Sequence, residues 1–122
     1  MASFTRHTMN YLFTIQFLEP ALRFLESLEP KSQEKILYVL WKARFTKDAE
    51  LFKKISSDIW EFRVLHQKKQ YRLLSFWYSS ETEVRCVICT NGFVKKTAKT
   101  PGLELQKAQQ LRQEYLQSKQ IK

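Results

Sequence analysis

Glycine is almost missing from this sequence, which contains two glycines in 122 residues. A Walker-type phosphate loop and a dinucleotide-binding fingerprint both need several glycines within a few positions, because their backbone must turn tightly and approach a phosphate closely. Enzymes that bind nucleotide cofactors through these motifs are therefore excluded. Histidine is equally rare, and neither of the two histidines lies in an HExxH pattern or a Ser/His/Asp spacing. We expect no metal and no small-molecule cofactor.

Cysteine and long apolar runs are also scarce. Cys86 and Cys89 form a single CxxC, but residues three apart on a strand point to opposite faces, and no second Cys or His pair is present to complete a zinc site. We therefore predict reduced packing residues in a reducing compartment. No uncharged apolar run approaches the roughly 18 residues of a membrane span, and no small-residue cleavage site follows residues 11–18. These absences predict a cytoplasmic protein without a membrane partner.

Aromatic residues, by contrast, are abundant: nine Phe, five Tyr and three Trp. They supply enough apolar bulk for one compact domain over residues 1–122, with a short extension at 1–10 and a tail at 118–122 that is expected to fray. The charge is uneven, because residues 1–61 hold 9 basic and 8 acidic side chains, whereas residues 62–122 hold 12 and 4. A basic half suits an anionic partner, although a solvated lysine surface gives the same count.

The hydrophobic periodicity changes along the chain. Apolar residues recur every three or four residues up to about residue 45, which is typical of amphipathic helices, and every second residue from Ile59 onward, which is typical of strands. Residues 47–57 are mostly polar and predict at most one helical turn. The predicted order is strand 12–17, helices 21–28 and 33–45 as an antiparallel hairpin, strands 59–66, 70–78 and 84–90, and a helix that begins at Pro101 with Thr100 as its cap. This is an α+β domain with a small antiparallel sheet.

A pair of arginines follows from the register of the first predicted hairpin. If the turn within residues 66–69 has an even number of loop residues, Arg63 lies directly opposite Arg72. Like charges across a strand pair are destabilising, so a fold that keeps them gains a shared carboxylate or a bound anion. Glu61, on the same face as Arg63, is the candidate carboxylate, and an ordinary ion pair is the alternative to an anion site. An odd-numbered loop would remove the pairing.

The segment that follows the third predicted strand combines an aromatic residue with lysines. Lysines attract phosphates, Phe93 offers a ring on which a base can stack, and the Thr97 hydroxyl can contact a phosphate or a sugar. This composition is typical of a site that binds single-stranded RNA. It also fits a solvated strand end at which Phe93 is the last residue of the core. His66 ends the strand of Arg63 and either reaches a bound RNA or is an exposed turn residue without a task.

These segments together resemble one protein family. The strings Ile59-Trp60-Glu61-Phe62-Arg63 and Tyr71-Arg72-Leu73-Leu74, followed by Gly92-Phe93-Val94-Lys95-Lys96-Thr97 and Lys99-Thr100-Pro101, are similar to the pattern of the RelE/ParE toxin superfamily, in particular its phage-derived, HigB-like branch. The resemblance covers about residues 12–117. It implies a RelE-like fold, with a small curved antiparallel β-sheet, an N-terminal helical hairpin and a C-terminal helix.

The resemblance also implies a function. Active members of the superfamily are toxins of type II toxin–antitoxin systems that cut messenger RNA on the ribosome as metal-independent endoribonucleases, and each is neutralised by a cognate antitoxin, often of the helix-turn-helix type. The implied catalytic residues are Arg63, Arg72, Lys95 and Lys96: a lysine takes the proton of a ribose 2′-hydroxyl while the arginines hold the phosphate. The expected RNA-binding residues are Phe93, Thr97, Lys99 and His66.

Other functions stay open at this point. Many relatives carry a histidine where this chain has Asn91, which predicts weaker activity or a reliance on His66. A ParE-like inhibitor of DNA gyrase would share the fold and make the sheet arginines structural. A non-catalytic module would use the basic half only to bind an antitoxin or a nucleic acid.

Overall fold

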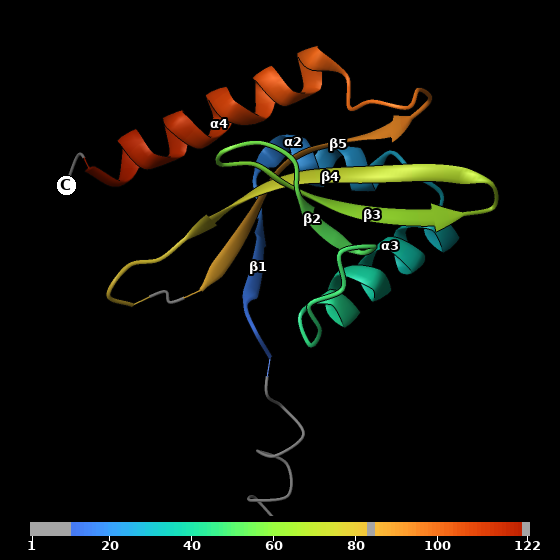
Figure 1. Cartoon of the computed structure of the whole chain (residues 1–122), viewed down its shortest axis with the longest axis horizontal. Coiled ribbons are helices and arrows are strands. Elements are labelled where there is room, and N and C mark those ends of the chain that lie inside the picture. Colours follow the sequence, from blue (N-terminus) through green and yellow to red (C-terminus); the bar gives the residue numbers. More distant parts are fainter. Residues whose placement is uncertain (1–10, 83–84, 121–122) are drawn as a thin grey trace, which may run out of the picture.

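The computed structural model describes residues 11–82 and 85–120, and its elements are labelled in Figure 1. In chain order they are β1 (Thr14–Phe17), α2 (Glu19–Glu26), α3 (Pro30–Ala43), β2 (Phe52–Lys54), β3 (Trp60–His66), β4 (Lys69–Tyr78), β5 (Cys86–Lys95) and α4 (Gly102–Gln120). The predicted α+β class is confirmed, and so is the order of the predicted strands and helices. The expected extension at 1–10 and the expected strand start at residue 84 lie outside the described residues.

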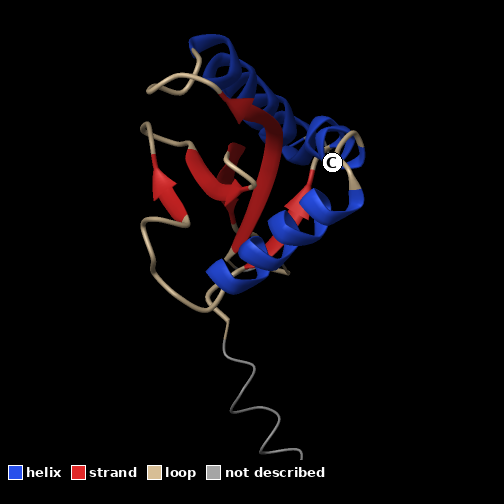
Figure 2. Cartoon of the chain, turned by 90° about the vertical axis from the view of Figure 1, so that its right-hand side faces the viewer, coloured by secondary structure: helices blue, strands red, loops and turns tan. Residues whose placement is uncertain are grey.

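The five strands form one sheet in the order β1-β5-β4-β3-β2. Strands β2 to β5 pair antiparallel, but β1 runs parallel to β5. The prediction of a fully antiparallel sheet is therefore wrong at β1, and the sheet is mixed. The pattern of side chains along a strand reports which face is buried and carries no information on the direction of its neighbour. Figure 2 shows how strongly the longest strands curve.

The helices cover both faces of the sheet, with α3 on one side and α4 on the other (Figure 1). Helix α2 packs mainly on β5 and α3 mainly on β3, through an inner row of apolar residues that includes Ala21, Leu25, Ile36 and Leu40. The two helices contact the sheet more than they contact each other, so the expected helical hairpin is not confirmed. Gly92 allows α2 to approach β5, because a Cβ at this position would clash with the Phe24 ring.

The two cysteines lie in different cores, one on each face of the sheet. Cys89 belongs to the core beneath α2 and α3, whereas Cys86 belongs to the core beneath α4. Both are buried, and they face opposite sides of the sheet, as the strand geometry predicts. Burial, with a smaller contribution from Cys86, raises the pKa of the Cys89 thiol, which therefore stays protonated at neutral pH. Both residues act as packing residues.

Strand β5 contains one extra residue, Thr90, opposite β4. Leu74 pairs with Asn91 and Ser75 pairs with Cys89, so Thr90 has no partner across the strand pair. The Thr90 hydroxyl instead lies 3.1 Å from the Leu74 carbonyl oxygen and 2.6 Å from Asn91 Oδ1. Beyond this bulge β5 continues to Lys95, five residues past its predicted end, and the bulge turns Asn91, Phe93 and Lys95 toward the α4 face.

Residues 47–57 contain the single turn that the sequence predicts, and after it a short edge strand that the sequence does not predict. The Asp48 carbonyl accepts the backbone N–H groups of Leu51 and Phe52, and this turn leads into β2. Strand β2 is only three residues long, too short for an alternating pattern to be visible in the sequence.

The turn between β3 and β4 has the even length on which the arginine pairing depends. Its two residues, Gln67 and Lys68, have φ angles of 50° and 67°, as a two-residue hairpin turn with left-handed backbone requires. Arg63 therefore pairs with Arg72, as predicted.

Helix α4 begins at Gly102, one residue after its predicted start, and is continuous to Gln120. The Thr100 hydroxyl does not cap it, because that group donates a hydrogen bond to Glu61 Oε1 at 3.0 Å. The predicted cap is therefore wrong, and Thr100 ties the loop after β5 to β3. None of the helices in the described part of the chain is long and apolar enough to cross a membrane.

Candidate functional site

Two arginines and one glutamate form a charged cluster on the α4 face of the sheet. Glu61 Oε2 lies 3.5 Å from the Nε atom of Arg63 and 3.5 Å from the Nε atom of Arg72. Glu61 and Arg72 are buried, whereas the side chain of Arg63 is 32% exposed. The shared carboxylate expected from the hairpin register is therefore present. Two positive charges share one buried negative charge, which leaves the cluster with a net positive charge.

Arg72 is held in place by its neighbours on β4. One terminal nitrogen donates to the Tyr71 carbonyl oxygen at 3.1 Å and the other donates to Gln70 Oε1 at 2.7 Å. Its buried Nε lies in ion-pair range of Glu61 without a hydrogen-bond partner. Burial lowers the pKa of Arg72, the Glu61 carboxylate opposes this shift, and Arg63 adds to it. Arginine nevertheless keeps its charge in proteins, so the cluster presents a fixed cation.

Two shallow hollows adjoin this cluster and share Gln70. The first, of about 350 Å³, is lined by Glu50, Arg63, Val64, Leu65, Gln70 and Arg72. The second, of about 760 Å³, lies between the β3–β4 turn and the loop after β5, and is lined by Lys68, Lys69, Gln70, Val94, Lys95, Lys96, Thr97 and Ala98. Together they make one basic surface, which we call the basic groove. Glu50 is the acidic side chain in its lining.

The basic groove brings together five of the eight residues predicted for the site. Arg63 and Arg72 line one hollow, and Lys95, Lys96 and Thr97 line the other. Lys95 pairs with Gln70 across the strands, next to the pair of Arg72 with Phe93. Lys99 is exposed in the following loop and lines neither hollow, and its carbonyl oxygen accepts a hydrogen bond from the Thr97 hydroxyl at 2.9 Å. Three further groove residues, Lys68, Lys69 and Gln70, could not be assigned to the site from the sequence, because only the turn geometry places them beside the loop.

Phe93 and His66 lie apart from this groove. Phe93 is 8% exposed and packs in the core beneath α4, so its ring does not offer a free face to a base. His66 alternates with Phe62 and Val64 along β3, which places it on the α3 face, opposite the arginines. Its Nε2 is buried without a hydrogen-bond partner. The geometry therefore gives Phe93 a packing role and removes His66 from the groove.

Asn91 connects the sheet to the first turn of α4. Its side chain is buried, and Nδ2 donates to the Glu104 carbonyl oxygen at 3.2 Å and to Glu104 Oε1 at 2.9 Å. An amide used in this way is engaged in packing, so Asn91 is not exposed to a substrate in the place of a catalytic histidine. This role of Asn91 could not be predicted from the sequence, because Glu104 is 13 residues away on another element.

Replacement of Asn91 by Ala is expected to lower the free energy of unfolding by about 1–3 kcal/mol, because it removes these bonds and leaves buried polar groups without partners. Urea unfolding followed by circular dichroism measures the change. Asn91→Asp is the matched variant: it places a second carboxylate beside Glu104 and should destabilise at least as much at neutral pH. An alanine variant as stable as the wild type would contradict the role of Asn91 as a link to α4.

The basic groove provides positive charge that can bind an anion, and its lining residues do not form a cation site. Within residues 11–82 and 85–120, no group of three or more His, Cys, Asp or Glu residues is positioned to hold a metal ion. Fixed guanidinium groups beside lysines suit a phosphodiester, since arginine binds phosphate oxygens in a defined geometry and lysine acts as a mobile point charge.

A model of a known protein family matches most of the chain. The family model described as "Phage derived protein Gp49-like (DUF891)" matches residues 23–113, from within α2 to within α4, and so includes every residue of the basic groove. No curated protein matches the chain.

Proposed function

The chain belongs to the Gp49-like family of phage-derived proteins, a family of toxins of toxin–antitoxin systems, and from this premise we propose that it cleaves messenger RNA on the ribosome. In this proposal the protein is a HigB-like member of the RelE group, and it inhibits translation in the cytoplasm. Its partners are the ribosome, messenger RNA and a cognate antitoxin of the helix-turn-helix type.

One observation carries the proposal: a net positive cluster, fixed by Glu61, opens into a groove lined with lysines. A single-stranded RNA backbone needs a positive groove along its phosphates. Cleavage also needs cations that are already fixed where charge develops in the transition state, because such groups need not reorganise during the reaction. Arg72, with two hydrogen bonds and an ion pair, meets this requirement.

The reaction we propose is attack of a ribose 2′-hydroxyl on the adjacent phosphate. The new bond joins the 2′-oxygen to phosphorus, the bond to the 5′-oxygen of the next nucleotide breaks, and the products are a 2′,3′-cyclic phosphate and a free 5′-hydroxyl. Arg63, the more exposed arginine, contacts the phosphate, and Arg72 supplies fixed charge behind it. Lys95 or Lys96, in its neutral form, accepts the proton of the 2′-hydroxyl, the departing 5′-oxygen takes a proton from the resulting ammonium group or from water, and Thr97 and Lys99 contact the RNA backbone.

Primer extension on a reporter messenger RNA, in a reconstituted translation reaction with and without ribosomes, tests this function. Wild-type protein should create new 5′ ends only when ribosomes are present. Lys95→Ala should reduce their rate of appearance by about 10²–10⁴-fold, as expected for loss of a proton-transfer group. Lys107→Ala, on an exposed position of α4, is the matched control and should cleave like the wild type. Absence of new ends with the wild-type protein would refute the proposal.

A second candidate function has one observation in its favour. Arg72 is only 5% exposed, and a buried arginine bound to a carboxylate is typical of a structural pair. This arrangement fits a ParE-like inhibitor of DNA gyrase or a non-catalytic binding module, in which the sheet arginines stabilise the fold. A gyrase supercoiling assay separates these alternatives: inhibition of supercoiling with intact RNA indicates the gyrase inhibitor, and neither effect indicates the binding module.

A further inference from the structure

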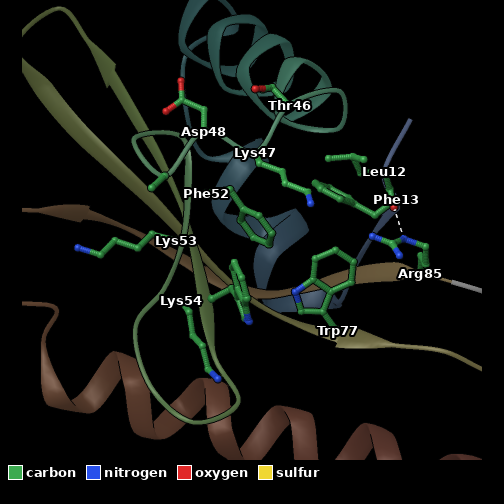
Figure 3. Close-up of a pocket in the computed structure, with 12 residues that line it drawn as sticks. Leu12, Phe13, Thr46, Lys47, Asp48, Phe52, Lys53, Lys54, Trp77 and Arg85 are labelled. Atoms are coloured by element: carbon green, nitrogen blue, oxygen red, sulfur yellow. Dashed lines mark hydrogen bonds between the residues drawn. The ribbon is translucent and has the colours of Figure 1, made fainter. Parts of the chain in front are cut away.

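An aromatic pocket lies on the α3 face of the sheet (Figure 3). Its volume is about 450 Å³, and its apolar lining consists mainly of the rings of Phe13, Phe52, Trp60 and Trp77. Edge strand β2 and the loop 46–49 frame it. It shares no lining residue with either hollow of the basic groove. It is therefore a second, separate surface feature.

The rim of this aromatic pocket is mostly positive. Lys47 and Lys54 are exposed at the rim, and the Arg85 guanidinium lies 5.9 Å from the Trp77 ring while Nε donates to the Leu12 carbonyl oxygen. Figure 3 shows the Lys47 side chain extending toward the rings and the Asp48 side chain pointing away from them. The Asp48 carboxylate also accepts the backbone N–H of Glu50. An occupant with negative charges near its apolar part is therefore favoured.

The arrangement of the rings favours an apolar side chain over a nucleic-acid base. A base held between two rings needs parallel planes about 7 Å apart, twice the optimal carbon contact distance. Phe52 and Trp60 are already stacked on each other at 4.9 Å, and Trp77 stands nearly perpendicular to both Trp60 and Phe13, at 81° and 80°. These rings therefore leave no pair of parallel faces between which a base could be held.

The free edge of β2 places backbone N–H and C=O groups beside the aromatic pocket. Backbone hydrogen bonds join β2 and β3 at every second residue pair. They run from Ile55 N to Ile59 O at one end and from Arg63 N to Leu51 O at the other. Lys54 lies between such bonded pairs, so its N–H and C=O point away from β3, toward the outer edge of the sheet. An extended segment can pair with these groups, and its alternate side chains would then face the aromatic pocket.

We propose that the aromatic pocket binds an apolar side chain of an extended acidic segment of a partner protein, and that this segment pairs with the free edge of β2. The positive charge of the rim, the arrangement of the rings and the free edge of β2 all favour this occupant. The identification of that partner as the antitoxin rests on the proposed function. The antitoxin would then be anchored on the face opposite the basic groove.

A fluorescein-labelled peptide, acetyl-Asp-Glu-Val-Phe-Val-Glu-Asp-amide, tests the pocket by fluorescence anisotropy with the full chain. We expect saturable binding that weakens at least tenfold when the central Phe of the peptide is replaced by Ala. Lys54→Glu and Trp60→Ala should each weaken binding at least tenfold. Lys54 is exposed, so its variant keeps the test valid if the tryptophan variant fails to fold. Lys107→Glu, on the opposite face, is the matched charge control and should bind normally.

Three results would overturn the pocket proposal: equal affinity for the alanine peptide, equal weakening by Lys54→Glu and Lys107→Glu, or displacement of the peptide by adenosine monophosphate, which would identify a base as the occupant. The Lys54→Glu variant should cleave messenger RNA on the ribosome like the wild type. Peptide binding without any cleavage by the wild-type protein would refute the proposed function and leave the pocket proposal standing, so the two failures are distinguishable.

Discussion

Glu61→Gln is expected to lower the free energy of unfolding by about 3–5 kcal/mol. The amide has nearly the same shape as the carboxylate and still accepts the Thr100 hydroxyl, but it carries no charge. Arg63 and Arg72 would then face each other across the strands without a negative charge between them, and Arg72 is buried. Arg63 is about one third exposed, so solvent screens part of the repulsion and the lower end of this range is expected.

Urea unfolding at neutral pH measures this change. Glu34→Gln, at an exposed position of α3, is the matched control and should shift the unfolding free energy by no more than about 0.5 kcal/mol. Adding Arg63→Met to Glu61→Gln should recover part of the loss, because one of the two opposing charges is then gone. If Glu61→Gln unfolds like the wild type, the carboxylate is not what allows the two arginines to lie opposite each other.

Arg63→Ala is expected to reduce the rate of ribosome-dependent cleavage by about 10²–10³-fold, which is typical of the loss of one group that stabilises charge in a transition state. Its effect on stability should be small, within about 1 kcal/mol, because Glu61 keeps its pair with Arg72 and a like charge across the strands is removed. This separation of activity from stability distinguishes a residue that contacts the phosphate from one that only supports the fold.

The same primer-extension reaction measures this prediction, with urea unfolding of the same protein samples beside it. Arg23→Ala is the matched control: Arg23 is exposed on α2 and makes only a surface ion pair with Glu19, so neither quantity should change appreciably. Wild-type cleavage by Arg63→Ala would assign the arginine pair to the fold alone and would favour the gyrase inhibitor or the binding module.

The pairing of Arg63 with Arg72 could be predicted from the sequence because it depends only on local rules. The strands alternate clearly, and the two-residue turn at Gln67 and Lys68 fixes the register of the whole hairpin. Neither turn residue is a glycine or asparagine, so the turn type itself was hidden and only its even length could be assumed. The position of Glu61 on the same face followed from the same alternation.

The features that sequence analysis missed depend on partners far apart in the chain. The direction of β1 is set by its pairing with β5, about 70 residues later, and nothing in four residues of strand encodes it. Phe93 was expected to offer a face to a base, but α4 covers it, and the contact between Ala108 and this core could not be foreseen from the strand. His66 was placed near the arginines because it shares a strand with Arg63, although strand alternation puts it on the other face.

The extra residue at Thr90 sets the phase of the second half of β5. Before it, the even-numbered residues Cys86 and Ile88 face α4, whereas after it the odd-numbered Phe93 and Lys95 do so. The bulge takes up the extra residue, and an unbroken alternation of the same residues from Ile88 onward would turn Lys95 toward α2, away from the side of the sheet that holds the arginines. The two faces of β5 therefore have to be counted separately on either side of Thr90, because a count in twos from Ile88 would place Lys95 on the wrong face.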